Sequence, residues 1–158
     1  MITNHLSQLL EVPGIEAVLL FTYHRKELFK WHKAEFNDHI TQEIAETFIQ
    51  IFGIEEKTAL RTREIAVPYE KGIVIARPFT KFFVIVVGKH KLDVPLVRMI
   101  LDVAMDDVEN DRKFQKLIKH APTEKFGYIN EFNLDEKEIA FVERVQSGHG
   151  EMSDGSEN

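Results

Sequence analysis

Cysteine is absent from the 158 residues, and serine is scarce. The serines stand at positions 7, 147, 153 and 156, so the side chains that most often act as nucleophiles in hydrolases are nearly missing. Without thiols the chain can form no disulfide, no thiolate zinc site and no iron–sulfur cluster. This composition is compatible with a reducing cytoplasm, where we expect the protein to be located.

Several other signals are missing as well. There is no glycine-rich phosphate loop of the GxxxxGKS or GxGxxG type, so we expect no bound nucleotide cofactor. The longest purely apolar run, residues 82–87, is far shorter than the about 20 residues of a spanning helix, and the N-terminus lacks the pattern of a signal peptide. A net charge of -6, from 26 acidic and 20 basic residues, disfavours nucleic acid and anionic membranes as partners.

Metal-binding and catalytic patterns are equally hard to find. None of the seven histidines is spaced from another by the two or four residues that a metal site favours, and we interpret them as solvated. The acidic stretch 106–111 does not have the spacing of a calcium loop and is typical of a solvated helix face. We therefore predict no catalytic, cofactor-binding or metal-binding residues, and expect that the protein is not an enzyme.

The hydrophobic pattern predicts helix, strand, strand, helix, three strands and helix over the first 110 residues. Gly53 is expected to end the second helix, and Pro68 indicates that the third strand lies at a sheet edge. The apolar stripe of the last helix breaks at Asp111, which indicates a kink or two separate pieces. The predicted helices are 2–11, 38–52 and one that begins near 93, and the predicted strands are 16–23, 28–33, 60–68, 73–77 and 82–87.

Three segments follow from this pattern. Residues 1–110 form the predicted domain, and residues 111–147 form a partly helical C-terminal extension whose aromatic side chains should pack somewhere. Residues 148–158 are polar and glycine-rich, and we predict a disordered tail.

The helix 38–52 carries more apolar surface than a single sheet requires. Ile40, Ile44, Phe48 and Ile51 form one stripe, and a second stripe lies about 100° around the helix. The second stripe consists of Ala45, Ile49 and Phe52. It has no obvious use in a monomer, so we predict that it is an interface; the alternative is that it packs on a loop or on the C-terminal segment.

The arginines near the third strand allow two interpretations. Arg61, Arg63 and Arg77 could stabilise the charge of phosphoryl transfer in a partner. The simpler interpretation is that arginines on an edge strand discourage aggregation and pair with neighbouring acids.

The order of elements, together with the segment VPGIEAV at residues 12–18, resembles the roadblock family of dynein light-chain type. Residues 71–75 and 82–88 and the start of the third helix fit the same pattern, and the resemblance covers about two thirds of the chain. The turn at residues 24–27 departs from it, because family members usually have glycine there.

The resemblance implies an α+β fold with a single five-stranded antiparallel sheet and helices on both faces. It implies that two copies join their sheets and pair their central helices, and that the protein is a non-catalytic regulator or scaffold of a small Ras-like GTPase. The residues expected at the dimer or partner interface are Ala45, Phe48, Ile49, Phe52, Arg61, Arg63 and Ile65. A ligand-sensing domain of the PAS or profilin-like type is the alternative, since it has a similar mixture of strands and helices.

Overall fold

The computed structural model describes residues 2–58 and 62–125. Within these ranges the chain forms four helices and five strands. They are α1 (Ile2–Leu10), β1 (Ile15–Thr22), β2 (Glu27–His32), α2 (Asp38–Thr58), β3 (Ile65–Tyr69), β4 (Gly72–Pro78), β5 (Phe82–Lys89), α3 (Val94–Asn110) and α4 (Arg112–Ile118). The predicted tail 148–158 and most of the predicted extension lie outside the described residues.

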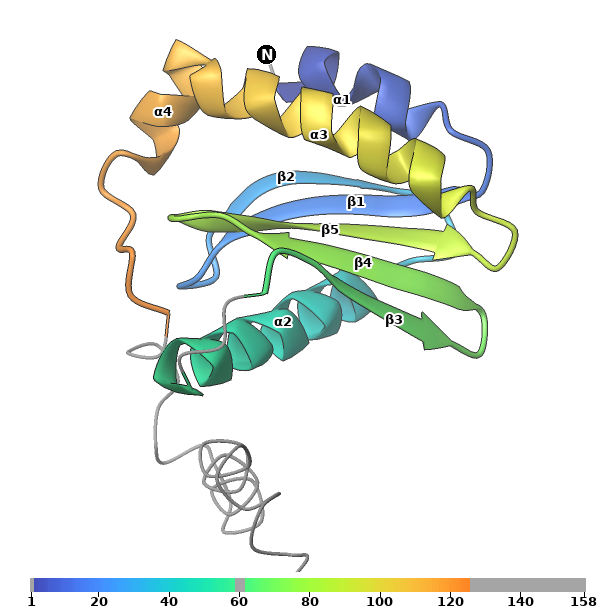
Figure 1. Ribbon diagram of the computed structural model, residues 1–158, viewed down its shortest axis with the longest axis horizontal. Helices are drawn as coiled ribbons and strands as arrows, with labels where there is room; N and C mark the ends of the chain where they lie inside the picture. Colours follow the sequence, from blue (N-terminus) through green and yellow to red (C-terminus); the bar gives the residue numbers. More distant parts are fainter. Residues whose placement is uncertain (1, 59–61, 126–158) are drawn as a thin grey trace, which may run out of the picture.

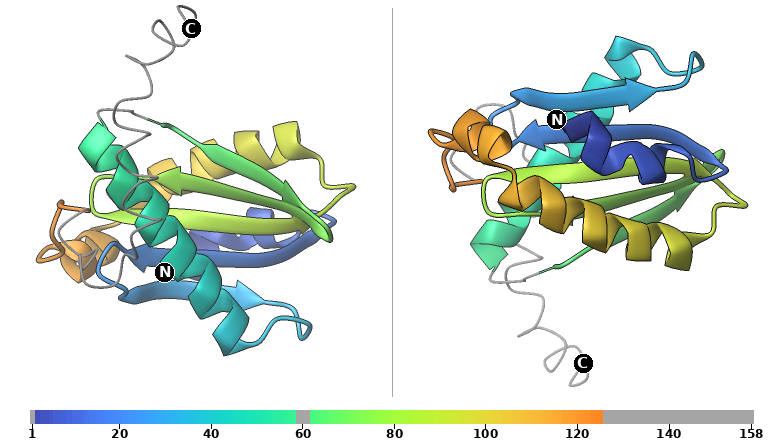
Figure 2. Two further views of the ribbon diagram at one scale, coloured as in Figure 1. Left: turned by 90° about the horizontal axis from the view of Figure 1, so that it is seen from below. Right: turned by 90° about the horizontal axis from the view of Figure 1, so that it is seen from above.

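A single antiparallel sheet runs through the domain in the order β2-β1-β5-β4-β3. It separates two helical layers (Figure 1). α1 and α3 lie side by side on one face of the sheet, and α2 crosses the other face obliquely (Figure 2). The predicted α+β fold, with one five-stranded sheet and helices on both faces, is therefore confirmed.

The inner strands are buried on both faces, as their continuous apolar runs predict. Every residue of β1 is buried, and so is every residue of β5 except its last. Because side chains alternate along a strand, Val18 and Leu20 pack toward α1 and α3, while Leu19 and Phe21 pack toward α2. Two cores thus lie back to back across the sheet.

The hairpin between β1 and β2 closes without glycine. Arg25 takes the left-handed conformation that glycine would normally supply, with φ of 76°. The Thr22 hydroxyl accepts a hydrogen bond from the Lys26 N–H at 3.0 Å, which stabilises this turn. Phe29 and Trp31 of β2 then pack on the α1 side, as the alternation predicts, and Lys30 lies on the α2 side beside Asp38.

Two predicted boundaries are wrong. α2 continues past Gly53 to Thr58. Gly53 is buried within the helix and does not take the left-handed conformation by which a glycine ends a helix. β3 begins at Ile65 and not at residue 60, so Thr62 and Arg63 precede the strand. β3 does lie at a sheet edge, as Pro68 predicts.

The stripe break at Asp111 marks a boundary between two helices. The Asp111 carboxylate accepts hydrogen bonds from the N–H groups of Lys113 and Phe114, and so caps the start of α4. His5 of α1 contacts the other carboxylate oxygen at 2.9 Å. These bonds hold the carboxyl pKa of Asp111 below its ordinary value, with the His5 contact as the largest cause. None of the helices in the described ranges has the length and apolar character that crossing a membrane requires.

Candidate interaction surfaces

The second stripe of α2 faces the sheet of its own chain. Ala45 and Ile49 are fully buried, and Phe52 is 1% exposed. Phe52 packs against the rings of Tyr23 and Phe83 at centroid distances of 6.1 and 5.6 Å. The premise that this stripe has no use within one chain is therefore wrong.

A different part of α2 is left half-buried. Ile40, Ile44 and Ile51 lie about 100° around the helix from the buried stripe, on the side that faces β4 and β3. Because α2 crosses the sheet obliquely, it leaves β3 and the adjoining part of β4 uncovered (Figure 2). We call the surface formed by these three isoleucines the apolar flank.

The uncovered strands continue this surface. Ile65, Val67 and Tyr69 of β3 alternate onto the same face as Val74 of β4, and Val67 is 41% exposed. Between the flank and these strands lies a cavity of about 450 Å³, lined on its apolar side by Phe36, Ile40, Ile44, Tyr69, Val74 and Val87. This surface thus combines the three isoleucines of the first predicted α2 stripe with the predicted interface residue Ile65. Phe48, the fourth member of that stripe, is instead buried in the core of its own chain.

The free edge of β3 offers few hydrogen-bonding groups. Pro68 has no N–H, so its nitrogen must face away from β4 in the paired strand. The backbone of Ala66, two residues earlier, faces outward with it. The outward row along this stretch of the edge therefore consists of one N–H and two carbonyls.

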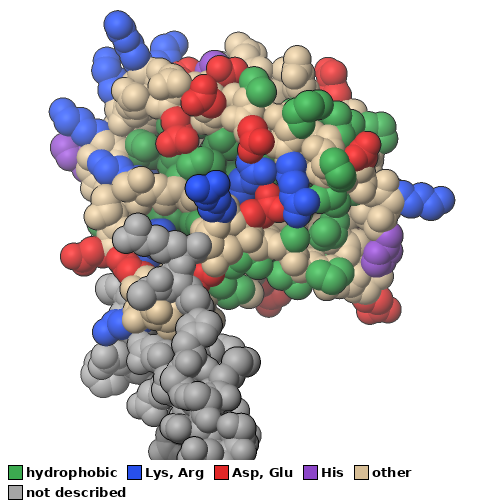
Figure 3. All heavy atoms as spheres, in the orientation of Figure 1, with side chains coloured by type: hydrophobic (Ala, Val, Ile, Leu, Met, Phe, Trp, Pro, Cys, Tyr) green, Lys and Arg blue, Asp and Glu red, His purple; other side chains and the backbone are tan. Residues whose placement is uncertain are grey.

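A network of charges lies on the opposite face of the same strands. Arg77 Nε donates to Glu64 at 2.9 Å and its guanidinium also contacts Asp102, while Arg98 Nε donates to Glu64 at 2.7 Å. Figure 3 shows basic and acidic side chains next to one another in the middle of the face that it draws. The Arg77 side chain is only 15% exposed, so its positive charge is already neutralised within the chain.

The other arginines differ from Arg77. Arg63 is exposed and has no ion pair within the part of the chain that the structure describes. Arg61 lies outside the described residues. Arg77 thus fits the pairing interpretation, and Arg63 is a described arginine whose side chain is available to a partner.

Glu16 is a buried acid that the sequence reasoning did not single out. The pairing of β1 with β5 shifts between Ile15 and Ala17, so Glu16 lies in a β-bulge and lines the cavity beside Val87. Its side chain is 5% exposed, and neither carboxylate oxygen has a hydrogen-bond partner among the described residues. Burial, and secondarily the charge of Glu16, raises the pKa of the Tyr69 hydroxyl. In the sequence, Glu16 could have been recognised as a single acidic residue directly before the apolar run 17–21.

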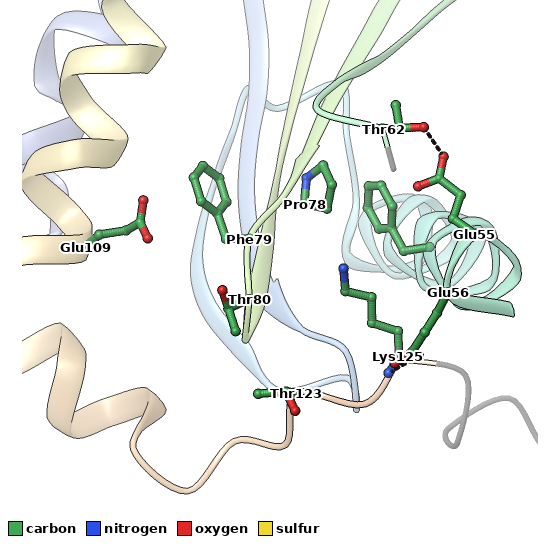
Figure 4. A pocket seen from close by; sticks show the side chains of 10 residues that line it. Glu55, Glu56, Thr62, Pro78, Phe79, Thr80, Glu109, Thr123 and Lys125 are labelled. Carbon is green, nitrogen blue, oxygen red and sulfur yellow. Dashed lines mark hydrogen bonds between the residues drawn. The ribbon is translucent and has the colours of Figure 1, made fainter. Parts of the chain in front are cut away.

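A second, larger cavity of about 940 Å³ opens at the other end of the sheet. In Figure 4, Glu109 of α3 points toward Phe79 from one side, and Glu55 and Glu56 of α2 lie on the other. Glu55 accepts from the Thr62 hydroxyl, and Glu56 accepts from the Lys125 N–H.

Burial in the first place, and the charge of Asp106 in the second, raise the pKa of Glu109. The hydroxyl groups that line this cavity belong to threonines, and none of its described lining residues is a histidine that could activate them. In the described ranges, no three acids or histidines are placed to hold a metal ion. The described residues that line the two cavities therefore favour no particular catalytic chemistry.

The comparisons with known proteins give a consistent result for the fold. No protein-family model and no curated protein matches the sequence. The crystal structure of the Roadblock/LC7 domain from Streptomyces avermitilis aligns with a TM-score of 0.52 at 10% identity, over 65% of this chain and 89% of that chain.

Two gliding-protein structures align equally well. Myxococcus xanthus MglB has a TM-score of 0.52 at 12% identity, over 68% of this chain and 85% of that one. The gliding protein MglB from Thermus thermophilus has a TM-score of 0.53 at 12% identity, over 76% and 90%. At such identities the likeness concerns architecture alone, and this chain has the fold of Roadblock/LC7 domains.

Proposed function

We propose that this protein is a dimeric, non-catalytic regulator or scaffold that binds a small Ras-like GTPase. The observation that carries the proposal is the apolar flank of α2 beside an uncovered, exposed edge strand. Apolar surface of this kind usually marks a protein–protein interface. The shared fold with Roadblock/LC7 domains supports the proposal, and so does the resemblance of residues 12–18 to that family.

We propose that a second copy of the chain pairs with the edge strand in an antiparallel register. A two-fold axis through Val67 and perpendicular to the sheet places Ala66 of one copy opposite Pro68 of the other. The Ala66 N–H of each copy then donates to the Pro68 carbonyl of the other, and the missing proline N–H leaves no donor unpaired there. The same axis brings the two apolar flanks toward each other on one side of a continuous sheet.

The dimer is tested with Ile44→Asp, which places a charge on the apolar flank at a half-buried position. Size-exclusion chromatography with light scattering should report a dimer for the original chain and a monomer for this variant. Val103→Asp is the matched control, because Val103 is 60% exposed on the α3 layer, away from the flank. A monomeric original chain at tens of micromolar would overturn the dimer, and so would an equal effect of the two variants.

The partner is tested with purified Ras-like GTPases from the same genome. We expect one of them to be retained by the immobilised protein in either its GDP or its GTP-analogue state, with Arg63→Glu weakening retention because this exposed arginine is available to a partner. The chain alone should release no phosphate from GTP. Retention of no GTPase in either nucleotide state would remove this part of the proposal.

A further inference from the structure

The 450 Å³ cavity beside the apolar flank has a polar inner end. We call it the Glu16 pocket, and it combines the apolar wall described above with Glu16, Glu35, Lys71 and Lys89. Its volume lies within the range of about 300–1,000 Å³ that is typical of small-molecule sites. Its lining of mostly apolar side chains with a few polar groups is typical of such sites as well. The pocket is formed entirely within one chain, so it does not depend on the proposed dimer.

The carboxylate of Glu16 has two ammonium groups nearby but accepts no hydrogen bond among the described residues. Lys89 Nζ and Lys33 Nζ stand 3.5 and 4.0 Å from the same oxygen, Oε1, and neither forms a hydrogen bond with it. The other oxygen, Oε2, also accepts no hydrogen bond in the described part of the chain. Burial of a charged group with empty acceptor positions is costly, so this site favours an occupant that brings a donor.

The remaining charges define what that donor can be. The two lysine side chains are 60% and 47% exposed, so their ammonium groups can move into solvent at little cost. Among the lining residues, the charges of Glu16 and Glu35 balance those of Lys71 and Lys89. Lys33 adds a positive charge near Glu16, and a cationic occupant takes its place when this exposed side chain turns into solvent. Charge-assisted hydrogen bonds to a carboxylate are about twice as strong as neutral ones, which favours a cationic donor over an alcohol.

We propose that the Glu16 pocket binds a small amphiphile with a primary ammonium head and an apolar chain. The head donates to the Glu16 carboxylate once the exposed lysine side chains beside it turn into solvent, and the chain lies along Ile40, Ile44 and Val74. A helix with its side chains is about 10–12 Å wide, so a second copy of the protein can cover the mouth of the pocket but cannot insert a helix into it.

The test uses three probes of equal chain length, n-octylammonium, n-octanol and n-octanoate, below their micelle concentrations. Isothermal titration calorimetry on the full chain should show the ammonium binding at least about tenfold more tightly than the carboxylate. Glu16→Gln, which keeps the shape of the side chain, should remove this preference. Glu35→Gln is the matched control, because this exposed acid lines the same pocket, and it should change the affinity by less than about threefold.

A second variant tests the pocket in case Glu16→Gln itself prevents folding. Val74→Phe fills the pocket from β4, which is separated from Glu16 on β1 by β5, and should weaken all three probes. The proposal is overturned if octanoate binds as tightly as octylammonium, or if Glu16→Gln retains the preference. It is also overturned if no ammonium binds while Glu16→Gln weakens self-association by light scattering, because a side chain of a second copy would then be the occupant.

Discussion

Two matched truncations decide which face of α2 lies on the sheet. Ile49 is fully buried against β1 and β5, whereas Ile44 is half-buried on the apolar flank. Ile49→Ala and Ile44→Ala remove the same carbon atoms from two positions of one helix. The change in helix propensity is therefore the same in both variants and cancels when their stabilities are compared. Any difference in the free energy of unfolding then reports the surroundings of the two side chains.

The magnitudes follow from burial. Truncation of a fully buried isoleucine to alanine costs about 2–5 kcal/mol, because the removed carbons no longer contribute their transfer free energy and the cavity that they leave costs free energy as well. At a half-buried site the cavity term is small, and about 1 kcal/mol remains. For a chain of this length each kcal/mol lowers the Tm by about 2–4 °C, so we expect a loss of roughly 4–20 °C for Ile49→Ala against 2–4 °C for Ile44→Ala.

Urea unfolding followed by the fluorescence of the single tryptophan, Trp31, measures the free energy of unfolding of each variant, and thermal unfolding with the same signal measures its Tm. It is repeated at several protein concentrations, because the stability of a dimer depends on concentration. Ile44→Ala should weaken that dependence, and Ile49→Ala should lower stability while retaining it. If Ile44→Ala is the more destabilising of the two, α2 lies on the sheet by its other stripe and the assignment of the flank is refuted.

Three further predictions test other parts of the fold. Gly72→Ala should destabilise the domain by several kcal/mol in urea unfolding, since its Cβ would overlap the Gly88 carbonyl oxygen; a neutral effect would contradict this close approach. The contacts that lower the pKa of Asp111 stabilise the fold above the unfolded pKa of about 4, and this effect is lost as the pH falls through the folded pKa. Asp111→Asn, like His5→Ala, should therefore flatten the decline of stability in acid below about pH 5, and an unchanged decline would count against the pair. Arg77→Ala should cost about 1 kcal/mol, because Glu64 keeps Arg98 as a donor and the exposed Asp102 loses its contact with Arg77; a stability unchanged by calorimetry would show that Arg77 contributes nothing to the network.

Much of the architecture was predictable because single residues carried strong signals. The runs at 17–21 and 82–87 are apolar at consecutive positions, which only a strand buried on both faces requires at that length. Pro68 placed β3 at an edge, and the break at Asp111 marked the junction of α3 and α4. In each case one local rule and the tertiary structure agree.

The errors occurred where tertiary contacts override a local preference. Gly53 normally favours a helix end, yet packing of α2 on the sheet carries the helix past it. The orientation of α2 could not be read from its periodicity, because both stripes are apolar and the oblique crossing decides between them. Glu16 was missed because a strand pattern does not indicate a bulge, and the bulge determines where its carboxylate points.

The pairing of β1 with β5 also determines when the domain can fold during synthesis. Val18 lies opposite Val86, so the innermost contacts of the sheet join residues that are far apart in the sequence. A nascent chain that ends before β5 has α1, α2 and the β1–β2 and β3–β4 hairpins, but it lacks the strand that joins the two hairpins into one sheet. Until ribosomal synthesis passes residue 89, the apolar segment 17–21 stays exposed to chaperones and to other chains, and the domain should then close in one cooperative step.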